Sequence, residues 1–232
     1  KVEDKWSNRI NTGTSTVGSK SMQLNNYDSG ALLNGSQFDG ASLAETAGWV
    51  SFMFDAIDGE VLTASSKRGR EYLICNIWGQ EPEFAHDEDG YNVINLFVKR
   101  YHDTAGMTTT SANYYMYLDD WRFGGGYGSR KWLGYDFRIY DPEGLANSNE
   151  SQRYILITWN SDTSKVTVWS GGNNGSIVYK TVEDWDFDKL TDGEFNGVQL
   201  GGVDGADYGI KDSRYDDIQM QLGEYLDPDD AD

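Results

Sequence analysis

The feature that most constrains the fold is a succession of short strand-forming runs separated by turns, with almost no helical periodicity. The run Tyr154–Trp159 is nearly continuous in β-forming residues, which predicts a strand covered on both faces, whereas Val166–Trp169 alternates and predicts one buried face. The turn-forming residues 160–164 between them predict a hairpin loop. A short helix is expected only over Val182–Leu190. The remaining expected strands are Trp49–Phe54, Glu71–Trp78, Tyr91–Tyr101, Tyr114–Leu118, Trp132–Tyr140, Gly197–Leu200 and Tyr215–Leu222.

Length and turn content predict a single all-β domain. The chain has 232 residues with only 3 prolines and 27 glycines, and regular short strands joined by polar turns are typical of sandwiches and barrels. Because the chain contains no internal repeat or linker, residues 1–232 are expected to form one antiparallel β-sandwich. The opening at Lys1 and the acidic tail Asp227–Asp232 have the character of domain edges, which predicts that the domain was excised from a larger multidomain protein.

The charge of the chain excludes several classes of partner. There are 38 acidic and 19 basic residues, a net charge of −19, whereas nucleic acid and anionic membranes require a basic surface. No run is long and apolar enough for membrane insertion. The acidity fits a solvated surface, and it also fits calcium sites, since Ca²⁺ binds oxygen ligands. Cys75, the one cysteine, lies in the apolar run Tyr72–Trp78, so we expect a buried, inert thiol and no intrachain disulfide.

Four runs follow one another in a distinctive order: Ile155–Asn160, Val166–Trp169, Val198–Gly202 and Tyr215–Met220. In order and composition they resemble the closing half of laminin G-like domains, and Gly48–Phe54 is similar to an early core strand of those domains. The resemblance implies a concanavalin A-like or laminin G-like jelly roll. It does not define the function, because this sandwich hosts lectins, adhesion modules, glycosidases and polysaccharide lyases.

The acidity, the lack of disulfides and the character of the ends together resemble the ligand-binding modules of large bacterial adhesins of the RTX type. Such modules bind peptides or sugars through calcium. The resemblance implies an extracellular or cell-surface, calcium-dependent recognition module that binds a peptide or carbohydrate ligand on another surface. As an isolated domain it is expected to be a monomer.

Clusters of acidic residues are the candidate calcium sites. His86–Gly90 has the short D-x-D-G spacing that lets carboxylates converge on one ion, although it lacks the distal Glu of an EF-hand loop. Taken alone, each cluster is better explained as a solvated turn. The metal interpretation gains weight because several clusters occur in one acidic chain and the loops of a sandwich gather at the ends of its sheets. The candidate metal ligands are Asp87, Asp89, Asp119, Asp120, Asp204 and Asp207.

The segment Asp119–Trp132 is the strongest candidate for a ligand face. Its glycines let the backbone approach a ligand closely, its Tyr and Trp rings give rigid contact area, and its arginines can pair with carboxylates. The alternative is a long hairpin loop whose rings cover the edge of the core. The candidate ligand-binding residues are Trp121, Arg122, Tyr127, Arg130 and, from the segment Val203–Gly209, Tyr208.

The sequence offers no clear catalytic set. A glycosidase of this fold needs a close carboxylate pair of the E-x-D-x-E kind, which is absent. The first alternative function is a polysaccharide lyase acting on a uronic-acid polymer, which needs a cation and a group that takes the C5 proton. Lys99–His102 offers such groups, but strand alternation places Lys99 and Tyr101 on one face and the other two residues on the opposite face. The second alternative is a structural spacer domain stabilised by calcium.

Overall fold

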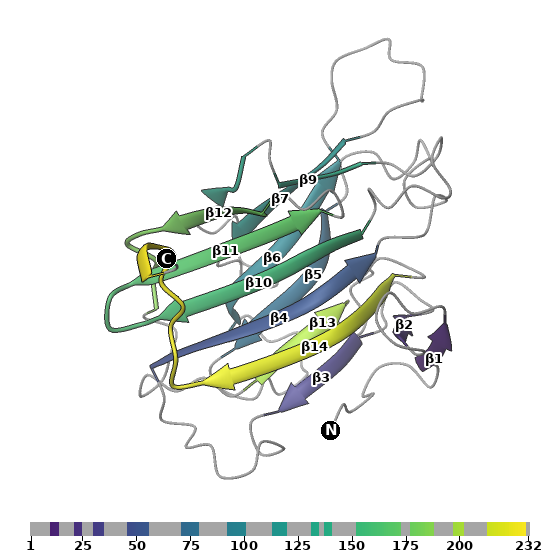
Figure 1. Cartoon of the computed structure of the whole chain (residues 1–232), viewed down its shortest axis with the longest axis horizontal. Helices are drawn as coiled ribbons and strands as arrows, with labels where there is room; N and C mark the ends of the chain where they lie inside the picture. The colour runs from purple at the N-terminus through teal and green to yellow at the C-terminus, as the bar shows by residue number, and fades with distance from the viewer. Residues whose placement is uncertain are drawn as a thin grey trace.

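The computed structural model describes residues 10–13, 21–24, 30–34, 46–55, 71–78, 92–100, 113–119, 131–134, 137–140, 152–172, 177–187, 197–201 and 213–230. Over these ranges the chain is almost entirely β-structure, with a short 3-10 turn at Pro228–Asp230 (Figure 1). None of the described segments forms a helix with the length and apolar character needed to cross a membrane.

The described strands form two antiparallel sheets, as the sequence predicts. Sheet I has the strand order β1-β2-β14-β4-β10-β11-β12, and sheet II has the order β3-β13-β5-β6-β7-β8, with β9 paired to β7. The strands are β1 (Ile10–Gly13), β2 (Ser21–Leu24), β3 (Gly30–Asn34), β4 (Ala47–Asp55), β5 (Glu71–Trp78), β6 (Asn92–Arg100), β7 (Asn113–Asp119), β8 (Lys131–Trp132), β9 (Arg138–Tyr140), β10 (Gln152–Asn160), β11 (Lys165–Gly172), β12 (Ile177–Val182), β13 (Gly197–Gly201) and β14 (Arg214–Leu222).

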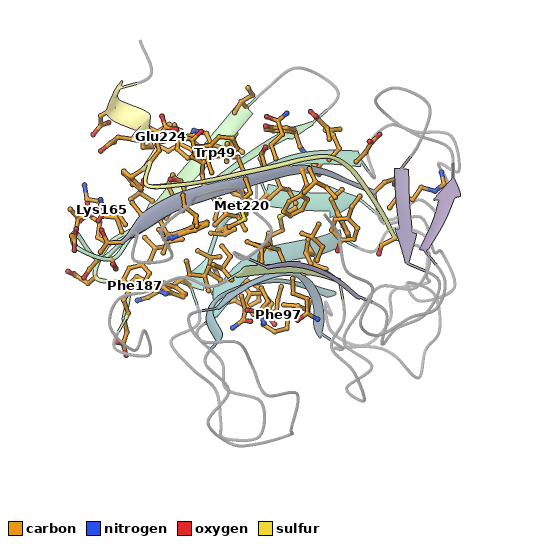
Figure 2. The ribbon with its side chains drawn as sticks, turned by 90° about the horizontal axis from the view of Figure 1, so that it is seen from below. Trp49, Phe97, Lys165, Phe187, Met220 and Glu224 are labelled. Carbon is orange, nitrogen blue, oxygen red and sulfur yellow. The ribbon has the colours of Figure 1, made fainter. Side chains whose placement is uncertain are left out.

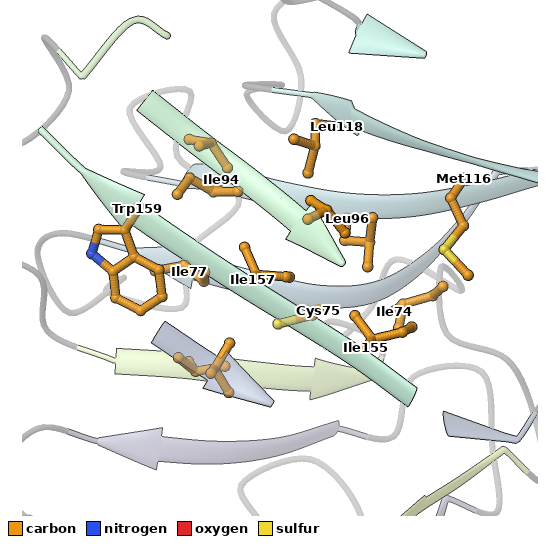
Figure 3. Packing of buried hydrophobic residues seen from close by; sticks show 14 of the residues in the cluster. Ile74, Cys75, Ile77, Ile94, Leu96, Met116, Leu118, Ile155, Ile157 and Trp159 are labelled. Atoms are coloured by element: carbon orange, nitrogen blue, oxygen red, sulfur yellow. The ribbon is translucent and has the colours of Figure 1, made fainter. Parts of the chain in front are cut away.

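The hydrophobic core lies between the two sheets, where inward-facing residues of the central strands meet (Figure 3). Ile155, Ile157 and Trp159 of β10 belong to one buried cluster with Cys75 and Ile77 of β5. The large indole of Trp159 fits because β4 carries Gly48 opposite it. A Cβ built on Gly48 would lie 2.6 Å from Cζ2 of Trp159. A large and a small residue thus share one site in the core.

The hairpin expected between β10 and β11 is present. Residues 161–164 form the turn, and Ser164 has the positive φ of 55° that closes it. The backbone N–H of Thr163 donates to Oδ1 of Asn160 at 3.1 Å, so a turn-forming side chain holds the loop. The predicted alternation in Val166–Trp169 is confirmed on the core side, where Val166 and Val168 are buried. The other face is not open as expected, because Thr167 is fully buried beneath the C-terminal residues and Trp169 is half-buried.

The helix expected over Val182–Leu190 is absent from the described part of that segment, which ends at residue 187. Val182 is the last residue of β12, and residues 183–187 have no helical turn. Trp185 and Phe187 are both buried in the main core. This two-residue spacing fits an extended chain that follows the end of the sandwich, so core packing overrides the local helical pattern.

The C-terminal residues Gly223–Asp230, here called the strap, cross the outer face of sheet I (Figure 1). The N–H of Leu226 donates to Oγ1 of Thr158 at 3.0 Å, and a hydrogen bond of 2.9 Å joins the Tyr225 hydroxyl to Oγ1 of Thr167. Trp49 Nε1 donates to a carboxylate oxygen of Glu224 at 3.1 Å (Figure 2). These three hydrogen bonds attach the strap to sheet I. The prediction of a strand covered on both faces holds at Thr158, which is fully buried, while Tyr154 and Leu156 are half-buried.

Candidate functional site

The outer face of sheet II, which points away from the main core, is buried along its centre. Leu73, Phe97 and Tyr117 form a second apolar cluster there. Figure 2 shows Phe97 on the side of its sheet that faces away from Met220, with the ribbon curving around it. A sheet face that carries its own buried cluster differs from an ordinary solvated face, and it is the first place to look for a site.

A row of amide side chains crosses this face. The registers place Gln199 of β13 opposite Asn76 of β5, and Asn76 opposite Asn95 of β6. All three are at most 2% exposed. The next position in the row is Asp119, which the register of β7 places opposite Asn95. Burying amides where apolar residues would suffice for packing costs free energy, so this amide row is a candidate for function.

A row of apolar and aromatic residues runs beside the amide row. Leu73 pairs with Phe97, Phe97 with Tyr117, and Tyr117 with Trp132 of β8. The rings of Phe97 and Tyr117 stack at 5.5 Å with an interplanar angle of 12°, and the Trp132 ring follows at 5.3 Å from Tyr117. Trp132 is 46% exposed. The aromatic row therefore begins inside the protein and ends on an accessible indole.

A third row contains charged residues. The register places Glu71 of β5 opposite Lys99 of β6, Lys99 opposite Tyr115 of β7, and Tyr115 opposite Arg138 of β9. Lys99 and Arg100 pair with successive residues of β7, and the expected split of Lys99–His102 between two faces stays a prediction. The other two residues of that run lie outside the described ranges.

Most of the sequence-predicted site residues lie outside the described ranges. They are Asp87, Asp89, Asp120, Trp121, Arg122, Tyr127, Arg130, Asp204, Asp207 and Tyr208. The two ends of the segment Asp119–Trp132 are described. Asp119 is the last residue of β7, and Trp132 pairs with Tyr117, so the segment joins two neighbouring strands of sheet II and adjoins the aromatic row. Within the described ranges, no three His, Cys, Asp or Glu residues are grouped closely enough to hold a metal ion.

Cys75 is buried in the main core, as expected. Burial raises the pKa of its thiol far above the ordinary value, so the thiol stays protonated and unreactive. The cysteine is a packing residue and takes no part in the candidate site.

Sequence reasoning missed the amide row, although a signal for it exists. Asn76, Asn95 and Gln199 each stand between aliphatic residues of a strand, in the triplets Cys-Asn-Ile, Ile-Asn-Leu and Val-Gln-Leu. A single amide in an apolar strand marks a position where polarity is kept against the packing preference. What the sequence does not give is the register that brings the three amides into one row.

Comparisons with known proteins identify the fold. Family models give no match to the sequence, and neither do curated protein sequences. Among solved structures, the marine PL-14 alginate lyase from Aplysia kurodai has a TM-score of 0.55 and 11% identity over 95% of this chain and 90% of that chain. The botulinum neurotoxin serotype D binding domain has a TM-score of 0.52 and 15% identity over 99% of this chain and 44% of that chain. A legume lectin-like domain from Entamoeba histolytica has a TM-score of 0.49 and 11% identity over 96% of this chain and 89% of that chain.

The chain is therefore an antiparallel β-sandwich of the jelly-roll type, the fold that it shares with the alginate lyase. This confirms the fold expected from the resemblance to laminin G-like domains. At these levels of identity the similarity defines the fold alone, so the function must be argued from the rows on sheet II.

Proposed function

We propose that this protein is a carbohydrate-recognition module that binds a glycan on the outer face of sheet II. The observation that carries the proposal is the aromatic row ending at Trp132, which lies beside the amide row. Sugar rings have apolar faces that stack on accessible Trp and Tyr side chains. The lectin-like fold supports the same class of ligand.

The two rows have different parts in this proposal. Trp132 is accessible and gives a stacking surface. Its ring contacts that of Tyr117, which in turn stacks on the buried Phe97. The amides are at most 2% exposed, so they lie behind the accessible surface and support the site from within. A ring that is held by neighbouring rings loses little conformational entropy on binding. The few contacts that a small ligand makes can then be enough to bind it.

The proposed site also includes a calcium ion. Asp119 stands at the end of the amide row, and Asp120 follows it in the segment that leads to Trp132. Carboxylates at this position would hold Ca²⁺ beside the aromatic row, where the ion could accept sugar hydroxyls as ligands. With the acidity and the absence of disulfides, this supports an extracellular adhesin module as the biological setting. A structural spacer would bind calcium without a ligand.

Truncating the exposed indole tests the proposal. The Trp132→Ala variant should bind immobilised glycans more weakly by roughly 1–3 kcal/mol, the range of a hot-spot truncation. Lys131→Ala is the matched control, because Lys131 is the exposed neighbour on the same short strand. Glycan and peptide arrays would be read with both variants in calcium. Equal binding by the two variants, or binding to peptides alone, would refute a carbohydrate site at Trp132.

A second candidate function, a uronate lyase, is favoured by the charged row. Lys99 and Arg138 flank Tyr115 in the register, which puts two cations and a phenol in neighbouring positions. In such a reaction the cations would neutralise the uronate carboxylate and the phenolate would take the C5 proton. The C4 glycosidic bond then breaks, the tyrosine hydroxyl passes the proton that it took from C5 to the leaving oxygen, and a C4–C5 double bond remains.

The unsaturated product absorbs in the near ultraviolet, so the two functions separate in one assay. A recognition module leaves the absorbance of alginate, glucuronan and ulvan solutions unchanged. A steady rise that Tyr115→Phe abolishes, while Trp132→Ala only weakens it through substrate binding, would establish the lyase instead.

A further inference from the structure

The outer face of sheet I carries a separate group of aromatic residues next to the strap. Two rows of this face lie side by side in the register. One row is Gln219, Ser51, Leu156, Trp169 and Tyr179, and the other is Asp216, Met53, Tyr154, Gly171 and Ile177. Toward β12 these rows become apolar and aromatic. We call Tyr154, Leu156, Trp169, Ile177 and Tyr179 the aromatic patch.

The aromatic patch is open to solvent on its β12 side. Ile177 is 70% exposed and Tyr179 is 54% exposed. The rings of Trp169 and Tyr179 meet at 6.1 Å with an interplanar angle of 45°. Gly171 stands between Tyr154 and Ile177 in the register and has no side chain. Gly171 is itself buried, so the neighbouring side chains cover it, and the main core does not explain the exposed side chains of Ile177 and Tyr179.

The strap borders the patch with hydroxyl groups. Thr167, two residues before Trp169 on β11, shares hydrogen bonds of 2.9 Å with both the Tyr225 hydroxyl and Oγ1 of Thr181. Thr181 lies two residues beyond Tyr179 on β12. Thr167 is fully buried, so only the half-buried hydroxyls of Thr181 and Tyr225 can reach a ligand beside the rings. This combination suits a ligand with both an apolar face and hydroxyl groups.

The size and charge of the patch restrict its occupant. Two strongly exposed side chains and their half-buried neighbours offer a few hundred Å² at most, while a stable protein interface buries about 800 Å² on each partner. The two rows contain a single charged residue, Asp216, and it lies on β14, away from the exposed rings. The charges nearest the bordering Tyr225 are those of Asp227, Asp229 and Lys165, which are of mixed sign. The chain as a whole carries a net charge of −19, which repels anions. A small neutral ligand fits these conditions.

We propose that the aromatic patch is a second binding site, for one or two residues of a neutral saccharide. The site is on the opposite sheet from the proposed glycan site at Trp132, and its existence does not depend on that proposal. A module with both sites could hold two glycan chains at once, so that its binding to a polysaccharide surface would exceed the affinity of either site alone.

The test uses neutral hexasaccharides of glucose, mannose and galactose, with hexagalacturonate as the acidic comparison. Binding would be measured by calorimetry in the Trp132→Ala background, and by the shift of the Trp169 indole N–H signal, assigned with Trp169→Phe. Tyr179→Ala should weaken binding at least about fivefold, since it removes the exposed ring. Lys180→Ala should leave binding unchanged, because Lys180 is an exposed neighbour on the same strand at an alternate position.

The results have clear readings. Binding of a neutral hexasaccharide that Tyr179→Ala weakens and Lys180→Ala does not would support the second site. The inference is overturned if no neutral hexasaccharide shifts the Trp169 signal, if the two variants bind alike, or if hexagalacturonate binds as well. Ile177→Ser gives a second variant at an exposed position should Tyr179→Ala fail to fold. Failure of the site at Trp132 would be seen separately, as unchanged array binding by Trp132→Ala.

Discussion

The hydroxyl of Tyr215 donates a hydrogen bond of 2.8 Å to the carbonyl oxygen of Ile74, and this bond joins the two sheets across the core. Tyr215 belongs to β14 of sheet I and Ile74 to β5 of sheet II. The Tyr215 ring is also packed against Phe52 and Phe54, with centroid distances of 5.6 and 5.2 Å. One residue thus supplies aromatic packing within its own sheet and a polar link to the other, which fixes how the sheets are placed on one another.

Tyr215→Phe removes that link without changing the ring. The Ile74 carbonyl would then be left in the core without this donor, and a buried polar group that loses its partner costs about 1–3 kcal/mol. We expect the free energy of unfolding, measured in urea, to fall by this amount. Tyr225→Phe is the control, because it removes a hydroxyl that is bonded at the half-buried strap. A loss for Tyr215→Phe no greater than for the control would show that the inter-sheet bond adds nothing to stability.

Alkaline pH should destabilise the fold in two stages. Burial raises the pKa values of both Cys75 and Tyr215, so each group stays protonated when folded and ionises more readily when unfolded. The stability that these two groups contribute is complete at a pH below their pKa values in the unfolded chain, which are near 8.5 for a thiol and 10 for a phenol. It is lost progressively as the pH rises above those pKa values. Stability should fall by about 1.4 kcal/mol per pH unit above pH 9 and about twice as steeply above pH 10. Urea unfolding from pH 8 to 11 measures both slopes. Cys75→Ala should remove the first stage alone.

Gly48→Ala tests the packing of Trp159. The new methyl group would lie 2.6 Å from the buried indole and 3.0 Å from the Gln221 carbonyl oxygen, so the ring or the backbone of β14 must move. Overpacking of this kind typically costs 1–3 kcal/mol. The midpoint of urea unfolding should decrease, and the double variant Gly48→Ala, Trp159→Phe should lose less stability than the sum of the single changes. Additive losses would mean that the two residues do not compete for space.

The sequence predicts the two-sheet fold well, because strand alternation and turn-forming residues are local patterns that can be recognised without knowing the strand order. The alternation in Val166–Val168 and the turn residues around Asn160 specify the β10–β11 hairpin without reference to the rest of the chain. The Val182–Leu190 segment shows the limit of such signals. Its local pattern suits a helix, but Trp185 and Phe187 are drawn into a core whose location depends on strands more than a hundred residues earlier.

The candidate site is harder to predict, because local sequence patterns do not show which distant strands pair. Asn76, Asn95 and Gln199 come from strands that are far apart in sequence, and only the registers of β5, β6 and β13 put them in one row. The same holds for Lys99, Tyr115 and Arg138. Reasoning along the chain instead groups neighbours, such as Lys99–His102, which a continuous strand would divide between its two faces. Sites on sheets are made across strands, so they appear only once the strand order is known.

The strap should open independently of the fold. The Leu226 N–H donates to Oγ1 of Thr158, whereas the Gly223 N–H donates to the backbone carbonyl of Ala47. Thr158→Val keeps the shape of the side chain and removes its hydroxyl. Hydrogen exchange should accelerate at the amide of Leu226 and stay unchanged at that of Gly223, because opening is local. Equal acceleration at both amides would indicate that the strap and the end of β14 open together.

Calcium should stabilise the protein and support ligand binding through the segment that follows β7. The net charge of −19 implies repulsion between carboxylates, and a bound cation relieves it. A ligand present at a hundred times its dissociation constant adds about 2.7 kcal/mol, so the Tm should rise clearly when calcium replaces EDTA.

Asp120→Ala should reduce that rise and abolish glycan binding in calcium while leaving a folded domain. Tyr127→Ala should keep the rise in Tm and weaken binding by roughly 1–3 kcal/mol. Identical melting curves in calcium and EDTA would exclude the calcium-dependent form of the proposed function. A full rise in Asp120→Ala would place the ion elsewhere, with Asp204 and Asp207 as the next ligands to change.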